Sequence, residues 1–158
     1  MTVPDENYPI TPVPFPAATK TASANIAGIE TAATTISFAD KILITISQNG
    51  RLAQWVHVPL SLSTTDNNPL SNSYLDTDPS LPNTDLLPTP SLTATSILGG
   101  TNGELSTLGE LLATQIASAI ITRDAREKRM VVLGLGLDKS MAGRERFAEI
   151  VGVVLGVL

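Results

Sequence analysis

The stretch MVVLGLGLDKSMAGRERFAEIVGVVLGVL, residues 130–158, decides the fold because it places a strand, a corner and a helix in a row. Residues 130–137 are all apolar or glycine, which is typical of a strand covered on both faces. Residues 138–140 form a polar corner, where the Ser140 hydroxyl can cap the next helix. An apolar stripe predicts that helix: Phe147, Ile150, Val151, Val154, Leu155 and Leu158. The stretch has no obvious catalyst and indicates a protein that acts through its surface.

The sequence before this stretch predicts several antiparallel strands. Residues 34–38 favour a strand, and the residues before them can pair with it across a bend near Gly28. Residues 41–59 favour a hairpin, because Asn49 and Gly50 suit the positive φ angles of a tight turn. Isoleucines at positions 42, 44 and 46 alternate with other residues and so share one face. Four side chains are predicted on the opposite face: Leu43, Thr45, Gln54 and Val56.

The later part of the chain adds a strand and two helices. Residues 92–98 predict a strand, and a glycine-rich turn then leads into a helix that runs to about residue 122. A charged connection, residues 123–129, enters the C-terminal strand. Strands followed by a helix, a strand and a helix predict the α+β class.

Two segments differ in composition from this domain. Residues 1–18 are rich in proline, which predicts a flexible tail. Residues 60–91 hold five prolines and four aspartates but no lysine or arginine. Such a segment cannot bury enough apolar surface to offset its chain entropy, so we expect a disordered insertion. The prediction is one domain, residues 19–158, that carries this insertion at about residues 60–91.

Charge and composition exclude several classes of protein. The net charge of −5 argues against a nucleic-acid binder, which would show a basic stripe. The absence of cysteine excludes disulfides and thiol catalysis. The N-terminus lacks a secretory signal, and the apolar tail after Phe147 is too short to span a membrane. We therefore expect no membrane contact and a cytoplasmic location, with the nucleus as a second one.

No motif supports an enzyme, a cofactor or a metal site. Gly134 and Gly136 lack the third glycine of a dinucleotide fingerprint and are expected to let a helix approach the sheet. His57 is the single histidine, and no nucleophile elbow accompanies it. Glu145 and Glu149 lie among arginines, which favours an exposed ion-paired face. Trp55 fits a core or interface anchor better than a ligand platform.

Two blocks of the sequence resemble the proteasome assembly chaperone 3 family, in a fungal-type, diverged form. KILITISQNGRL, which starts the segment 41–59, is similar to the family's hydrophobic strand, Gln-x-Gly turn and return strand. VVLGLGLDKSMAG, residues 131–143, is similar to the family's strand and its Lys-Ser-Met-x-Gly corner before the final helix. The resemblance covers about residues 26–60 and 92–155; the insertion and the tail depart from the shorter family pattern.

This resemblance implies a single six-stranded antiparallel sheet with two or three helices on one face. It implies a sheet-to-sheet dimer with a related chaperone, the fourth one, or with a second copy. The dimer is expected to bind a 20S proteasome α-subunit, α5, and to promote α-ring assembly. The predicted contacts form two groups. The dimer face has Leu43, Thr45, Gln54 and Val56, and the α-subunit contact has Lys139, Arg144 and Arg146.

Two other hypotheses remain open at this point. One is a small α+β dimerisation or scaffold module unrelated to the proteasome, which would self-associate without affinity for α-subunits. The other is a ligand-binding protein or enzyme with a pocket under the helices, which a ligand would stabilise against heat.

Overall fold

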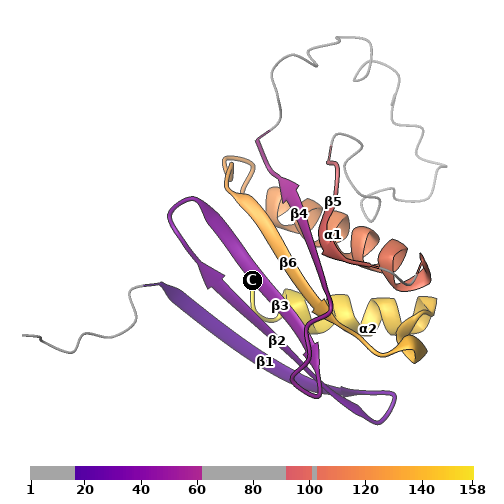
Figure 1. The fold of residues 1–158 in the computed structure, drawn as a ribbon. Coiled ribbons are helices and arrows are strands. Elements are labelled where there is room, and N and C mark those ends of the chain that lie inside the picture. Colours follow the sequence, from indigo (N-terminus) through magenta and orange to yellow (C-terminus); the bar gives the residue numbers. More distant parts are fainter. Residues whose placement is uncertain (1–16, 62–91, 101–102) are drawn as a thin grey trace, which may run out of the picture.

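A computed structural model describes residues 17–61, 92–100 and 103–158, which form one sheet and two α-helices (Figure 1). The strands are β1 (Ala18–Ile26), β2 (Ile29–Ser37), β3 (Lys41–Gln48), β4 (Gln54–Pro59), β5 (Thr95–Gly99) and β6 (Met130–Gly136). The helical segments are α1 (Gly103–Arg123), the short 3-10 helix η3 (Lys139–Met141) and α2 (Arg144–Leu155). The predicted α+β class is confirmed.

The sheet has six strands, as expected, but it is mixed rather than purely antiparallel. Its strand order is β1-β2-β3-β6-β4-β5. β6 pairs with β3 in parallel, whereas the other neighbouring strands are antiparallel. The predicted hairpin of residues 41–59 is therefore wrong, because β6 lies between β3 and β4 (Figure 1).

The turn that suggested the hairpin does form. Asn49 and Gly50 have φ angles of 53° and 67°, and an isolated bridge joins Gln48 to Arg51. After the turn the chain pairs with β6 and not with β3. The Ala53 N–H, just before β4, donates to the Leu135 carbonyl of β6 at 2.7 Å. Because β6 carries only apolar side chains and glycine, a central position paired on both edges suits it. The turn residues specify that the chain reverses, but not which strand fills the space between its two arms.

Both helices cover the same side of the sheet (Figure 1). α1 packs against β4 and β6, and α2 packs against β1 and β2. The core lies between these layers and takes every second side chain of the strands. Its largest fully buried side chains are Ile26, Ile44, Ile46, Val56, Val58, Leu112, Ile116, Val131, Leu133, Met141, Ile150 and Val154.

Within the described part of the chain, α1 is the helix that is long and apolar enough by composition to cross a membrane. The core helix of a folded domain meets the same criterion when one of its faces is buried. Eight residues of α1 are buried here: Leu108, Gly109, Leu112, Ala113, Ile116, Ala117, Ser118 and Ile120. Their burial in the fold accounts for the apolar composition of α1.

The corner after β6 is built differently from the prediction. The Ser140 N–H donates to Oδ1 of Asp138 at 3.0 Å, so Asp138 caps η3. This backbone hydrogen bond also lowers the pKa of the Asp138 carboxyl. α2 begins only at Arg144, with Gly143 as its N-cap and no side-chain cap. The predicted Ser140 cap is wrong because η3, anchored by the buried Met141, occupies the residues before α2.

Gln48 connects this corner to the sheet. Its side chain is 2% exposed and makes two hydrogen bonds. Nε2 donates to the Thr31 hydroxyl at 2.8 Å, and Oε1 accepts the Asp138 N–H at 2.7 Å. A buried amide with both ends bonded orients its neighbours, so Gln48 fixes where the chain leaves β6.

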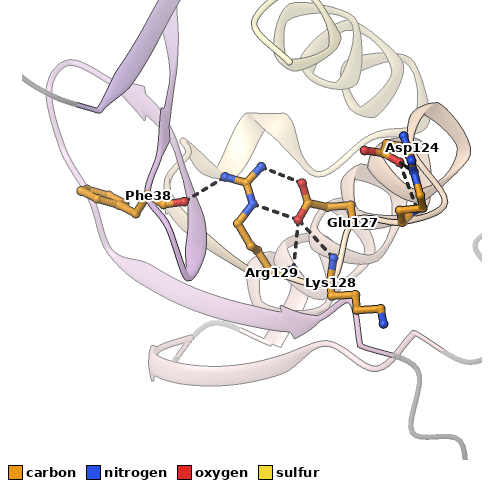
Figure 2. Close-up of polar contacts among 6 residues, drawn as sticks. Phe38, Asp124, Glu127, Lys128 and Arg129 are labelled. Atoms are coloured by element: carbon orange, nitrogen blue, oxygen red, sulfur yellow. Dashed lines mark hydrogen bonds and ion pairs between the residues drawn. The ribbon is translucent and has the colours of Figure 1, made fainter.

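An ion pair fixes the other end of β6, where the chain arrives from α1 (Figure 2). The Arg129 guanidinium donates to both carboxylate oxygens of Glu127, at 2.9 and 2.6 Å, and to the Phe38 carbonyl at 2.8 Å. The hydrogen bond from the Arg129 side chain is the main reason that the pKa of Glu127 falls to about 2. This cluster joins the connection after α1 to the turn between β2 and β3.

The predictions for the tail and the insertion fall largely outside the described residues. Nothing described tests flexibility in residues 1–16 or 62–91. The expected boundaries shift slightly, because β1 already begins at Ala18 and Leu60 is buried after β4. The chain that flanks both segments therefore belongs to the sheet and its core.

Candidate functional site

The sheet face opposite the helices is covered by none of the described elements, and we call it the open face (Figure 1). Its side chains alternate with the core positions of the same strands. They are Thr19, Thr21, Ser23 and Asn25 in β1; Glu30, Ala32, Thr34 and Ile36 in β2; Lys41, Leu43, Thr45 and Ser47 in β3; Trp55, His57 and Pro59 in β4; Thr95 and Leu98 in β5; Met130, Val132, Gly134 and Gly136 in β6.

Strand register arranges these side chains in rows across the sheet. The central row contains Thr21, Thr34, Thr45, Gly134, Trp55 and Leu98. Its β1 end is polar, and the hydroxyl oxygens of Thr21 and Thr34 lie 3.0 Å apart. Its β5 end is apolar, and Leu98 is 67% exposed. The next row places Ile36, Leu43, Val132 and His57 side by side, each half-buried.

The chain's single tryptophan lies in the central row of this face, on β4 beside the edge strand β5. Trp55 and Gly134 are directly opposite each other on β4 and β6. A Cβ atom at position 134 would lie 2.9 Å from the indole atoms Cη2 and Cζ3. The indole therefore lies over the space that the glycine leaves, and this explains Gly134. The expectation that Gly134 and Gly136 serve helix packing is wrong: a Cβ at Gly136 would lie 1.6 Å from the Arg51 carbonyl oxygen.

Charge is nearly absent from the open face. Among its strand positions, only Glu30 and Lys41 carry a formal charge at neutral pH, and both are exposed. Lys41 lies 3.1 Å from Asp40, in a pair whose side chains are 46% and 71% exposed. Protein interfaces are depleted of charge at their centre and enriched in tryptophan, so the composition of the open face fits a protein-binding surface.

The structure separates the four residues predicted to share the dimer face. Leu43 and Thr45 lie half-buried on the open face. Gln54 and Val56 point to the helices instead and are 5% and 0% exposed. The prediction that Gln54 and Val56 lie on the dimer face is wrong, because it assumed that β4 pairs directly with β3. With β6 between the two strands, Trp55 shares a face with Thr45.

Gln54 has a structural contact on the helix side. Its Nε2 donates to the Ser106 carbonyl at 3.3 Å, near the start of α1. A Cβ atom at Gly109 would lie 2.6 Å from Oε1 of Gln54, so α1 needs a glycine where it crosses this amide. The contacts of Gln54 thus determine where the first half of α1 packs against β4.

A groove on the helix side contains one of the residues predicted to meet an α-subunit. It lies between the first half of α1 and the start of α2 and has a volume of about 860 Å³. Leu108, Leu111, Phe147 and Arg144 are among the residues that line it. Lys139 is exposed in η3, outside the groove. Arg146 pairs with Glu149 at 3.5 Å. The structure does not gather the three basic side chains around one hollow.

The described residues contain no group of three histidine, cysteine or acidic side chains that could hold a metal ion. His57 stands half-buried on the open face, beside Val132. Glu145 and Glu149 are exposed on α2, and Glu149 has the Arg146 partner just described.

Sequence reasoning missed several open-face residues. Ile36 and Glu30 share the period of β2, and alternation alone could have found them together with Lys41. Val132 could not be found in this way, because β6 is apolar at every position and does not alternate.

Comparison with known proteins gives a result at the level of the fold. The sequence matches no family model and no curated protein. The structure is similar to a chain of a crystal structure described as a novel chaperone complex for yeast 20S proteasome assembly, with a TM-score of 0.54 and 10% sequence identity. The match covers 88% of this chain and 97% of that chain. This chain therefore shares the fold of that chain of the yeast complex.

The identity of 10% means that the similarity lies in the arrangement of strands and helices and not in particular side chains. The roles of individual residues therefore rest on the geometry of this chain.

Proposed function

We propose that this protein is a proteasome assembly chaperone of the third family, which binds a 20S α-subunit, α5, as a dimer and promotes α-ring assembly. The open face is the dimer surface, and its partner is a related chaperone or a second copy. The protein acts stoichiometrically, without catalytic turnover or a cofactor. Its expected location is the cytoplasm, with the nucleus as a second one.

The observation that carries this proposal is an uncovered, nearly uncharged sheet face in a chaperone fold of this kind. Trp55, Leu43 and Val132 give this face an apolar centre without a helix to cover it. Monomeric proteins rarely expose a large apolar surface that nothing covers. A second sheet can pack on such a face at about 10 Å, as in a β-sandwich.

The α-subunit contact is proposed on the basic side chains at the corner and at the start of α2. Lys139 and Arg144 are exposed, and Arg144 lines the groove between α1 and α2 on the helix side. Two surfaces on opposite sides of the sheet allow one chain to hold a partner chaperone and a client at the same time. Charge at the rim of such a contact acts mainly on the association rate and its salt dependence.

The experiment is affinity purification of tagged protein from its native cells, followed by mass spectrometry. We expect proteasome α-subunits and a second small chaperone, or a second differently tagged copy, but no mature β-subunits. Two variants separate the surfaces: Leu43→Asp should lose the chaperone partner, and Arg144→Glu should recover less α-subunit while it keeps the chaperone partner.

Arg123→Glu is the matched control, because it reverses an exposed arginine at the far end of α1. It should retain both partners. Absence of α-subunits from wild-type samples, in cells that are assembling proteasomes, would refute the proposed function. The dimerisation or scaffold module would then be the better account.

A further inference from the structure

We propose that the groove between α1 and α2, lined by Leu108, Leu111, Arg144 and Phe147 among others, holds a short amphipathic helix of the α-subunit. This inference rests on the proposed function and deepens it, because it specifies where the client binds and what kind of segment the client presents. The occupant presents apolar side chains to the groove, an acidic side chain to the α2 wall and a basic side chain to the α1 wall.

One face of α1 forms the longer wall of the groove. Glu104, Leu108, Leu111 and Gln115 line it and recur at steps of four, three and four residues, which places them on one side of the helix. Leu111 is 51% exposed, and Phe147 on the α2 wall is half-buried. The groove therefore has apolar side chains on both walls that a partner can cover.

The two walls carry opposite charges. Arg144 lies at the start of α2, and none of the four ion pairs among the described residues includes it. α2 also begins without a side-chain cap, so its first-turn N–H groups favour an anion beside Arg144. On the other wall, Glu104 is exposed in the first turn of α1. Charge complementarity therefore calls for an acidic group toward α2 and a basic group toward α1.

The walls also indicate that the occupant is helical. The described residues that line the groove belong to α1, to α2 or to the turn just before α2, and none belongs to a strand. An extended peptide would find no strand edge there for its N–H and C=O groups, whereas a helix pairs these groups internally. The lining residues of α1 run from Gly103 to Gln115, about 18 Å, which is the length of about three helical turns.

A small molecule fits this groove less well than a helix does. Pockets for such ligands enclose most of the ligand's surface. Here both walls carry exposed side chains, among them Thr107, Leu111 and Arg144, so the groove of about 860 Å³ lies open at the surface. A longer segment that covers the groove from outside buries these side chains together.

Binding of purified α5 subunit to the chaperone dimer that contains this chain, measured by biolayer interferometry, tests the proposal. Leu111→Asp should raise the dissociation constant at least about tenfold, because it puts a charge among the apolar contacts. Leu111→Met keeps an apolar side chain of similar volume and should stay within about threefold of wild type.

Leu155→Asp is the matched control. Leu155 is a 44% exposed leucine at the far end of α2, outside the groove, and the variant should leave the dissociation constant unchanged. Thermal unfolding shows whether each variant is folded. An equal loss of binding in Leu111→Asp and Leu155→Asp would overturn the proposal.

The charges of the two walls have their own test. Glu104→Lys should slow association with the α5 subunit by about threefold or more, because the α1 wall then repels the basic side chain of the client. Glu110→Lys makes the same change on α1 outside the groove and should leave the rate unchanged. Equal rates for the two variants would contradict the orientation given to the client helix.

A photo-reactive benzoylphenylalanine in place of Leu111 identifies the occupant directly. After irradiation of the complex, mass spectrometry should find a cross-link to a helical segment of the α5 subunit with apolar residues three or four positions apart. A cross-link to a strand or loop of α5, to the partner chaperone or to a second copy of this chain would overturn the proposal.

Failure of this inference is distinguishable from failure of the proposed function. If the dimer binds α5 and Leu111→Asp binds it equally well, the proposed function stands and the groove is not the contact. If the wild-type dimer binds no α-subunit, the proposed function fails and the client helix proposed here fails with it.

Discussion

The two faces of the sheet come from the same strands but are built from different kinds of side chain. Toward the helices, β3 presents Ile42, Ile44 and Ile46, all 5% exposed or less. Toward the open side, the same strand presents Leu43, Thr45 and Ser47, all half-buried. Isoleucine suits permanent burial, whereas hydroxyl side chains tolerate both water and contact. The difference indicates that one face stabilises the fold and the other is available for a partner.

The largest expected effect tests the helix-covered face. Ile44→Ala should lower the free energy of unfolding by about 3–4 kcal/mol, because it removes a fully buried side chain and leaves a cavity. Its neighbour Leu43→Ala on the open face should cost about 1 kcal/mol or less in the monomer, since less apolar area is lost from burial. Urea unfolding of both variants gives the comparison. The measurement is made at a protein concentration too low for dimers to form. Equal losses of unfolding free energy in the two variants would contradict the distinction between the faces.

A second test compares two glycines of the open face. Gly136→Ala should cost about 2–3 kcal/mol, because its Cβ would collide with the Arg51 carbonyl and the backbone must move. Gly134→Ala should cost less, because an indole can rotate away, but its tryptophan emission should shift to the red. Thermal unfolding and fluorescence measure the two effects. If Gly134→Ala left the emission unchanged, the indole would not depend on that glycine for its orientation.

A third test concerns the ion pair at the entry to β6. Glu127→Gln should cost about 2 kcal/mol at neutral pH, because it removes charged hydrogen bonds to Arg129. The pKa of Glu127 is lowered from 4.5 to about 2, so its contribution is complete above pH 4.5 and is lost as the pH falls toward 2.

The wild type and the Glu127→Gln variant should therefore converge in stability across that acidic range. Glu149→Gln on α2 is the control, because its ion pair should contribute little to stability. The Glu149 side chain is 46% exposed, and its carboxylate lies 3.5 Å from Arg146 in an i,i+3 pair. A constant difference between wild type and Glu127→Gln from pH 6 to pH 2 would contradict the role given to the carboxylate.

The smallest expected effect lies at the polar edge of the open face. Thr21→Ala removes one of two hydroxyl groups whose oxygens are 3.0 Å apart. An exposed cross-strand pair of this kind contributes about 0.5 kcal/mol. Chemical denaturation should show a loss of that size and no change in dimerisation, because Thr21 lies on the outer strand β1. A dimerisation defect in Thr21→Ala would extend the contact surface to that edge.

The sequence predicted the elements better than their arrangement. Helical periodicity located α1 and α2, and a continuous apolar run located β6. The hairpin failed because the Asn49–Gly50 turn specifies only a local reversal, while pairing with β6 depends on residues 130–136, far away in the chain. That same error placed Gln54 and Val56 on the wrong face. Trp55 was identified as a core or interface anchor, but its support from Gly134 required the strand register.

The position of β6 has a consequence for synthesis of the protein. β3 and β4 are both made long before β6, yet each pairs with β6 and not with the other. A nascent chain that ends before Met130 holds two separate groups of strands with no ladder to join them. Folding of the complete sheet must therefore wait until the ribosome has released the segment through Gly136. Until then the edge of β3 that pairs with β6 in the finished sheet has no partner strand, and such an unpaired edge can pair with other chains.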